Sequence, residues 1–177
     1  MLHSRVGLED RPVDLVAERY DLALRIGRLP DSSLSAQKIG VSRRLVVASP
    51  EYLARHGTPR EPRELRAHEC ILYTHQRQLD TWVFDRPGGG EERIRVSGRL
   101  LCNHGDAIAK LAACGAGLAW LPEFIVRPLV DEGRLVSVLS ERCTAEMPIQ
   151  AVFSTRAHRS FKEELVVDAL RRRLSAD

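Results

Sequence analysis

Strand patterns and helix signals alternate along this chain, and this alternation limits the possible folds more than any other feature. The segment Tyr20–Gly27 has the pattern of a short strand, and Leu45–Ala48 is a compact apolar run typical of a buried strand. A helix signal follows at once, because Ser49 can cap a helix, Pro50 suits its first position and Gly57 can end it. The alternation indicates an α/β fold with a largely parallel sheet.

The remaining elements follow from the same signals. Helices are expected at residues 11–19, 50–56, 62–67, 106–114 and 161–174, with a broken helix around Pro128, and strands at 20–27, 45–48, 70–73, 118–121, 133–139 and 147–154, with a hairpin over 81–100. Gly88–Gly90 forms the expected turn of that hairpin.

Gly115 and Gly117 raise the question of a nucleotide-binding loop. A dinucleotide-binding fingerprint has its glycines after a strand and before a helix. Here a helix precedes the glycines, a strand follows them, and Trp120 occupies the third glycine position. We therefore expect Gly115 to end the helix in a left-handed conformation and Gly117 to let the backbone enter the sheet closely.

The segment Asn103–Asp106 lies between a predicted strand and a predicted helix. The N–H groups and the positive dipole end of such a helix favour an anion or a carboxylate. Ser49 begins a second helix of this kind, and Gly27–Asp31 is a third loop at the end of a strand. Ligands of open α/β sheets bind outside the carboxyl ends of strands, so these loops are candidate binding elements. Alternatively, Asn103, Asp106 and Ser49 only cap their helices.

Composition and cysteine spacing exclude several classes of function. The net charge is +3, from 27 basic and 24 acidic residues, and the basic residues are spread along the chain apart from Arg171–Arg173. No helix-turn-helix, zinc-finger or RNA-binding signature appears. Cys70, Cys102, Cys114 and Cys143 lack metal-ligand or CxxC spacing, so we expect reduced thiols and neither a metal nor a cofactor.

Catalysis and membrane insertion are not expected. The chain lacks the Gly-x-Ser-x-Gly and His-Glu-x-x-His motifs, and His68-Glu69-Cys70 falls at a helix-to-strand junction where side chains alternate in direction. No apolar run approaches the roughly 20 residues of a membrane helix, and the N-terminus lacks a signal-peptide pattern. The sequence thus predicts a cytoplasmic protein that is not an enzyme.

Three segments in succession carry a family resemblance. They are VDLVAERYDLALRIGRLPDSSLSAQKIG, RRLVVASPEYLARHGTPREPRELRAHECILY and NHGDAIAKLAACGAGLAWLPEFIV, and they resemble the effector-binding domain of LysR-type transcriptional regulators. The closing segments GRLVSVL and MPIQAVFSTRAHRSFKEELVVDAL fit the same pattern. The resemblance runs from about Val6 to Leu174, and DLALRIGRLPDSSL and SPEYLARHGTP are its most specific parts.

The resemblance implies a fold like the type 2 periplasmic binding proteins. Two Rossmann-like α/β lobes would be joined by two crossover strands, near 43–48 and 149–153, with a small-molecule pocket in the cleft. Lobe one would comprise 1–45 plus 147–177, and lobe two 46–146. Compared with the family, we expect the first strand and helix of lobe one, and the DNA-binding domain, to be missing from this chain.

The function that the resemblance implies is that of a small-molecule sensor which controls DNA binding and transcription by the full-length regulator. The expected effector contacts are Gly27, Arg28, Ser49, Asn103, His104 and Asp106. Arg28 could pair with the carboxylate of a small organic or aromatic acid, or be a solvated loop arginine. His104 could equally be a capping or surface histidine. The expected partners are the effector and a second copy in a homodimer, with DNA reached only through a helix-turn-helix domain absent from this chain.

An alternative is a truncated interaction fragment. A first lobe without one strand would expose a sheet edge, through which the chain could dimerise and modulate full-length regulators without binding an effector.

Overall fold

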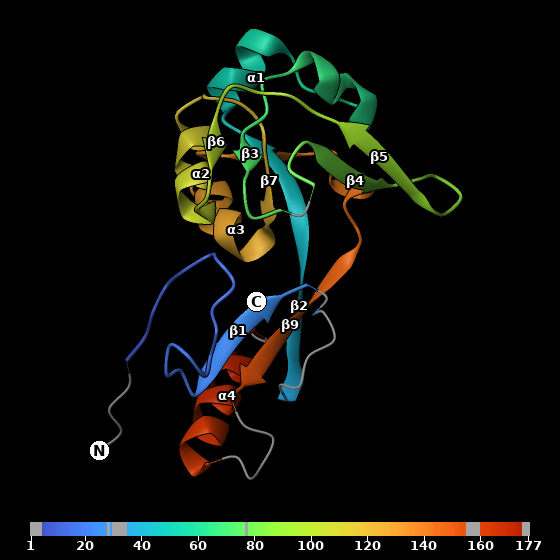
Figure 1. Cartoon of the computed structure of the whole chain (residues 1–177). Coiled ribbons are helices and arrows are strands. Elements are labelled where there is room, and N and C mark those ends of the chain that lie inside the picture. The colour runs from blue at the N-terminus through green and yellow to red at the C-terminus, as the bar shows by residue number, and fades with distance from the viewer. Residues whose placement is uncertain (1–4, 28, 30–34, 77, 155–159, 175–177) are drawn as a thin grey trace. The chain divides into compact units, whose positions relative to one another are not determined.

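The structure, a computed structural model, describes residues 5–27, 29, 35–76, 78–154 and 160–174. The chain forms two compact units (Figure 1). Unit 1 consists of Met1–Ser42 and Glu146–Asp177, and unit 2 consists of Arg43–Ala145. Strand β2 (Ser35–Ala48) begins in unit 1 and ends in unit 2.

Unit 1 contains a sheet with the order β1-β9-β2. Strand β1 (Leu22–Ile26) pairs antiparallel with β9 (Glu146–Phe153), and helix α4 (Phe161–Leu174) has the bounds that the sequence predicts. The buried core of unit 1 consists of Ile39, Ile149, Ala151, Phe153 and Val167. The helix therefore covers the sheet through the face that carries Val167.

The helix expected at 11–19 is wrong, because this segment forms only turns. The carboxylate of Asp14 accepts hydrogen bonds from the N–H groups of Val16 (3.0 Å) and Ala17 (3.1 Å), as a helix cap would. Arg19, however, has a left-handed backbone conformation with φ 57°. A right-handed helix cannot continue through a residue in this conformation, so the chain makes one helix-like turn and no more.

Unit 2 contains a mixed sheet rather than the largely parallel sheet that the alternation suggests. β2 pairs antiparallel with β7 (Ala119–Pro122) and with β8 (Val136–Val138). Parallel pairing continues through a bridge between Cys70 and Leu118 and through β3 (Leu72–Tyr73) with β6 (Leu101–Cys102). The chain enters unit 2 along β2, so this strand runs against the strands that follow the helices of the unit.

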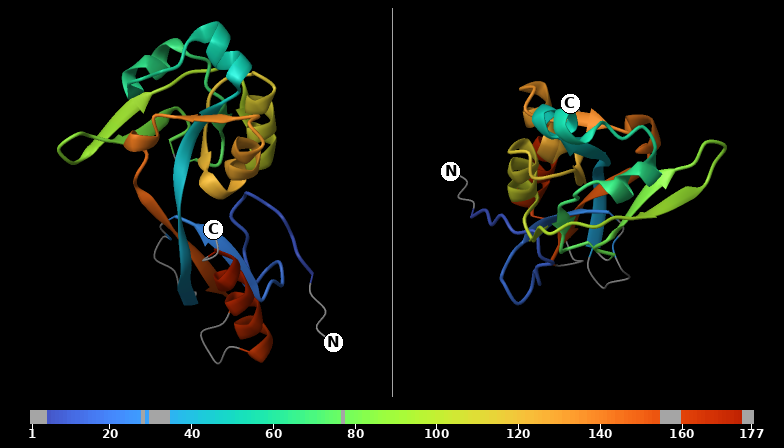
Figure 2. Two further views of the ribbon diagram at one scale, coloured as in Figure 1. Left: turned by 180° about the vertical axis from the view of Figure 1, so that it is seen from behind. Right: turned by 90° about the horizontal axis from the view of Figure 1, so that it is seen from above.

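Helices and a hairpin cover this sheet (Figures 1 and 2). They are α1 (Pro50–His56), η1 (Pro62–Ala67), α2 (Gly105–Ala113), α3 (Glu123–Asp131), η2 (Ser140–Arg142) and the β4–β5 hairpin (Thr81–Asp85 and Glu91–Arg95). Ser49 caps α1, since its hydroxyl accepts a hydrogen bond from the N–H of Tyr52 at 3.1 Å, and Gly57 ends it with φ 86°. Both roles agree with the sequence signals.

The α3 helix is continuous, although a break was expected around Pro128. Proline donates no backbone hydrogen bond and usually breaks a helix interior. Here the side chain of Val126 is fully buried, and α3 packs on α2 and β7. Tertiary packing therefore holds the helix together across the proline.

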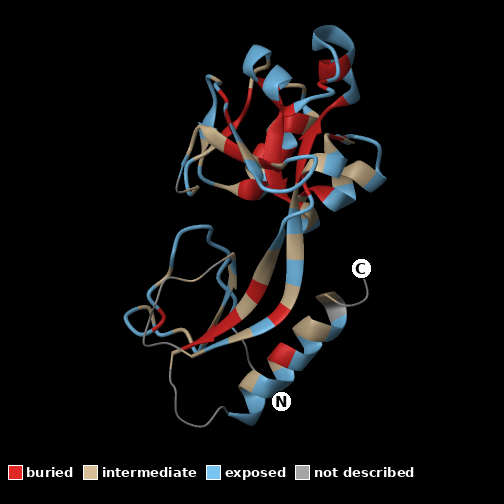
Figure 3. Cartoon of the chain, turned by 90° about the vertical axis from the view of Figure 1, so that its right-hand side faces the viewer, coloured by how far each residue is buried: buried red, intermediate tan, exposed pale blue. Residues whose placement is uncertain are grey.

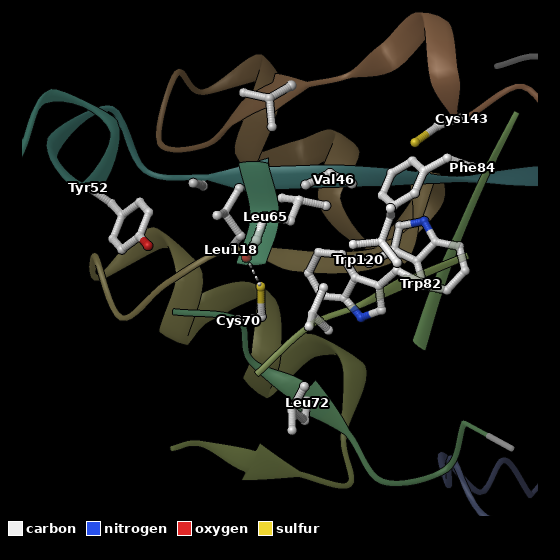
Figure 4. Packing of buried hydrophobic residues seen from close by; sticks show 14 of the residues in the cluster. Val46, Tyr52, Leu65, Cys70, Leu72, Trp82, Phe84, Leu118, Trp120 and Cys143 are labelled. Atoms are coloured by element: carbon white, nitrogen blue, oxygen red, sulfur yellow. Dashed lines mark hydrogen bonds between the residues drawn. The ribbon is translucent and has the colours of Figure 1, made fainter. Parts of the chain in front are cut away.

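Alternating residues of the central strands divide unit 2 into two apolar cores, which appear as buried segments in Figure 3. One face packs on α2 and α3 through Leu45, Val47, Ile71, Ala119, Leu121, Ile108, Ala109, Ala112 and Val126. The other packs on the hairpin, α1 and η1 through Val46, Ala48, Cys70, Leu118, Trp120, Trp82, Phe84, Tyr52 and Leu65 (Figure 4). Successive side chains of a strand point to opposite faces, so each central strand contributes to both cores.

The two glycines after α2 have the roles expected from the sequence. Gly115 has φ 80°, and its N–H donates to the carbonyl of Ala112 at 3.0 Å, which ends the helix. A Cβ atom on Gly117 would lie 2.5 Å from the carbonyl oxygen of Glu69. The backbone therefore approaches its neighbour too closely for any side chain at this position.

Candidate functional site

Strand direction divides the predicted site residues of unit 2 into two groups. β2 pairs Arg44 with Pro122 and Val47 with Ala119, so its last residues lie beside the beginning of β7. The strands β7, β3 and β6 and the Cys70 segment run in parallel. Strand β6 therefore ends at the end of the sheet where β2 enters unit 2. We call this the Arg44 end of the sheet.

The expected convergence of Ser49 with the Asn103–Asp106 segment is therefore wrong. Asn103 follows β6 at the Arg44 end, whereas Ser49 follows β2 at the opposite end of the same sheet. Ser49 is 3% exposed, and its hydroxyl is committed to capping α1. The two helix starts look alike in sequence, but antiparallel pairing separates them.

Asn103, His104 and Asp106 form one group at the start of α2. His104 is the N-cap residue, and its own side chain makes no capping hydrogen bond to this helix. The side chains of Asn103 and Asp106 are exposed, and Nδ1 of His104 lies 3.8 Å from a carboxylate oxygen of Asp106. The carboxylate of Asp106 suits the positive end of the helix dipole. The same end of the dipole favours a negative or polar group of a ligand beside Asn103 and His104.

Gly27 belongs to unit 1, where it follows β1 with φ 97°. Its N–H donates to the carbonyl of Pro148 and its carbonyl accepts from Nε2 of Gln150, both at 2.9 Å. No atom of the described residues lies within 4 Å of the place where a Cβ would stand. Arg28 lies outside the described residues.

Sequence reasoning missed two residues at the Arg44 end, Arg44 and Trp120. The guanidinium carbon of Arg44 lies 4.4 Å from the centre of the Trp120 ring, which is cation–π contact. Nε of Arg44 and Nε1 of Trp120 are both buried, and neither has a hydrogen-bond partner among the described residues. Burial lowers the pKa of Arg44, and the nearby Tyr73 opposes this shift.

The sheet register produces this contact. Val46 lies opposite Trp120, and Arg44 is two residues before Val46, so Arg44 and Trp120 point to the same face. Trp120 is fixed from behind by Trp82 and Phe84, with ring centres at 6.0 and 6.3 Å (Figure 4). The available sequence signal was a charged residue in phase with the buried positions 46 and 48.

The His68-Glu69-Cys70 cluster is structural. Burial raises the pKa of Cys70 to about 12, which keeps its thiol protonated and unreactive. Nδ1 of His68 lies 3.2 Å from the hydroxyl of Tyr52, which accepts a hydrogen bond from the N–H of Glu69. Across the described ranges, no group of three histidine, cysteine or acidic side chains is placed to hold a metal.

A polar hollow of about 390 Å³ lies between η1, the hairpin and η2. Arg142 contacts Glu61 at 2.9 Å and Glu92 at 3.1 Å, and its Nε donates to the carbonyl of Asp85 at 2.6 Å. Glu92 also pairs with Arg63 at 3.0 Å. These ion pairs tie the hairpin to η1 and η2, and with Arg86 the hollow is lined by three arginines and two glutamates.

The fold defines a class of protein: it is a type 2 periplasmic-binding-protein-like regulatory domain of mixed α/β structure. Residues 2–175 match the family model of the LysR substrate binding domain, and the chain belongs to this family. No described helix is long and apolar enough to span a membrane.

Curated relatives are transcriptional regulators rather than enzymes, in agreement with the expected absence of catalysis. An HTH-type transcriptional regulator of Haemophilus influenzae is 36% identical over 161 residues, which are 91% of this chain and 56% of the relative. The regulator CrgA of Neisseria meningitidis is 36% identical over 155 residues, 85% of this chain and 51% of the relative. The chain thus spans about half the length of the curated relatives it matches.

Solved structures show the same fold. The regulatory domain of CrgA from Neisseria meningitidis aligns with a TM-score of 0.78 and 32% identity, covering 90% of this chain and 78% of that one. Full-length AphB of Vibrio cholerae aligns with a TM-score of 0.79 and 26% identity, covering 97% of this chain and 58% of that one.

Proposed function

We propose that this chain senses a small-molecule effector and thereby controls DNA binding by the LysR-type regulator to which it belongs. The observation that carries the proposal is that Asn103 and His104, at the start of α2, lie at the same end of the unit 2 sheet as Arg44. Family membership supplies the functional context.

The effector in this proposal is a small organic or aromatic acid. Asn103 offers both a donor and an acceptor from an exposed amide, and His104 offers a ring nitrogen next to the helix start. The positive end of the α2 dipole favours the negative charge of the ligand. Asp106, Gly27 and Arg28 remain proposed contacts, whereas Ser49 is left out because its hydroxyl caps α1.

The relatives support the regulatory part of the proposal, because they are named as HTH-type transcriptional regulators. We infer that the protein acts in the cytoplasm, where a regulator meets DNA, and that its effector domains form a homodimer. The comparisons do not support the alternative of an interaction fragment that binds no effector.

A ligand screen followed by one matched pair of variants tests the proposal. Small organic and aromatic acids that raise the melting temperature are titrated by calorimetry into the wild type, Asn103→Ala and Thr58→Ala. Both side chains are exposed, but Thr58 follows α1, which begins at the opposite end of the sheet. We expect Asn103→Ala to weaken binding at least tenfold and Thr58→Ala to change it less than twofold. Equal affinities would contradict the proposed place of the site.

A further inference from the structure

We propose that Arg44 and Trp120 form a subsite for the carboxylate group of the effector. This inference rests on the proposed function and adds to it the two residues that select an anionic ligand.

Nε of Arg44 lacks, among the described residues, the acceptor that a buried guanidinium nitrogen normally has. Charged side chains are rarely buried unless they are paired, because removing them from water is costly. Arg44 is half-buried, its Nε is closed off from water, and no described carboxylate or carbonyl accepts from it. The part of the chain that the structure describes therefore leaves Nε of this cation without an acceptor.

The preceding residue, Arg43, has an acidic partner. Arg43 points to the other side of β2 and pairs with Glu123, with distances of 2.8 Å from Nε to Oε2 and 3.3 Å from Nη2 to Oε1. The nearby carboxylate of Glu123 also contacts Arg127. The acidic side chain of Glu123 is thus present at this end of the sheet, but it pairs with the exposed Arg43 and not with the half-buried Arg44.

The ring of Trp120 holds the guanidinium group of Arg44 in place. This group stacks on the ring of Trp120, which is itself only 9% exposed and packed against Trp82. A group held in one orientation loses less conformational entropy when it binds a ligand. Guanidinium N–H groups also match the two oxygens of a carboxylate.

The indole nitrogen of Trp120 is a second donor beside Arg44. Nε1 of Trp120 is buried and has no acceptor within the described ranges. Indole nitrogen is a donor only, so a cation cannot satisfy it, whereas a carboxylate oxygen can. A buried donor without a partner costs free energy, and this cost ends when the ligand supplies an acceptor. Both unpaired groups therefore select the same ligand chemistry.

The experiment uses the two tryptophans of the chain as reporters. In a nitrogen–proton correlation spectrum each indole N–H gives one signal, and the signal lost in Trp82→Phe assigns the other to Trp120. Benzoate and the uncharged benzamide are titrated as probes. We expect benzoate to shift the Trp120 signal and benzamide to bind at least tenfold more weakly.

Variants on adjacent positions identify the arginine. Arg44→Gln is expected to weaken benzoate binding at least tenfold and to abolish the Trp120 shift, while the matched control Arg43→Gln stays within threefold of the wild type. Arg44→Lys keeps the charge but not the two-pronged geometry, and an intermediate loss is expected. The dispersion of the remaining amide signals shows that each variant is folded.

Two results would overturn the subsite, and they differ from a failure of the proposed function. If benzoate binds with the Trp120 signal unchanged, or binds Arg44→Gln as tightly as Arg43→Gln, the subsite is wrong while effector binding stands. If neither benzoate nor any acid of the ligand screen binds the wild type, the effector site itself is refuted together with its subsite.

Discussion

Val46 lies directly opposite Trp120 in the antiparallel pairing of β2 with β7. This register places Arg44, two residues earlier on the same face, over the Trp120 ring, whereas Arg43 pairs with the carboxylate of Glu123. One backbone pairing thus decides which of two neighbouring arginines is half-buried, with an Nε that has no acceptor among the described residues.

This burial has a cost that substitution should reveal. We expect Arg44→Met to raise the free energy of unfolding by about 1 kcal/mol, because an apolar side chain of similar length replaces an unpaired, partly buried charge. Urea denaturation of the ligand-free protein measures this change. Arg43→Met is the control, since loss of its exposed ion pair with Glu123 should lower stability by no more than about 1 kcal/mol. A marked loss of stability in Arg44→Met would mean that the arginine has a partner.

Ser49 and Asn103 should separate stability from binding. Ser49→Ala removes the cap of α1 and should lower the free energy of unfolding by about 1 kcal/mol, with effector affinity unchanged. Asn103→Ala should weaken effector binding and leave the free energy of unfolding unchanged. Denaturation and calorimetry on the same preparations check both, and a loss of affinity in Ser49→Ala would return that residue to the site.

Gly98 should tolerate no side chain. A Cβ at this position would lie 1.8 Å from the carbonyl oxygen of Cys70, at a parallel bridge beside the sheet. We expect Gly98→Ala to lower the free energy of unfolding by about 3 kcal/mol or more, because backbone must move to relieve the overlap. Gly133→Ala is the control: this glycine has φ 70° with open space around it, so only the conformational cost of about 1–2 kcal/mol applies. Similar losses in the two variants would argue against the close approach.

His68 should make stability depend on pH below neutrality. Burial, and then the neighbouring His56, lower the pKa of His68 in the folded state. The unfolded chain therefore binds this proton more readily, and the contribution of His68 to stability is present above its unfolded pKa and lost as the pH falls. We expect His68→Gln to flatten the dependence of stability between pH 7 and 5.

His75→Gln serves as the control for this effect, because His75 is exposed. Thermal denaturation across the pH range gives the comparison. An unchanged slope in His68→Gln, or an equal flattening in His75→Gln, would assign the dependence to other groups.

Arg142 should be important for the position of the hairpin. Its side chain is 15% exposed and bridges Glu61, Glu92 and the carbonyl of Asp85. Arg142→Met should lower the free energy of unfolding by about 2–3 kcal/mol, since it removes the cation of Glu61, one of the two cations of Glu92 and the donor to the carbonyl of Asp85. The exposed Arg134, which pairs with the exposed Glu132, is the control, and Arg134→Met should change stability by less than about 1 kcal/mol. A small effect in Arg142→Met would mean that solvent already screens the cluster.

Local signals in the sequence determined much of this fold. Ser49, Pro50 and Gly57 fixed the ends of α1, Gly115 fixed the end of α2, and the bounds of α4 were predicted correctly. These features depend on φ values, caps and neighbouring side chains, which residues close in sequence supply. The family was recognisable for the same reason, since whole segments match in order.

Only the tertiary structure decided the site. Whether β2 runs with or against β7 depends on pairing between segments far apart in the chain, and that choice separates Ser49 from Asn103. The same pairing leaves Arg44 on Trp120 without an acceptor among the described residues, although Arg43 and Arg44 are indistinguishable as adjacent letters. Burial and partners are set by what packs across a strand, and a sequence read along one strand does not contain that information.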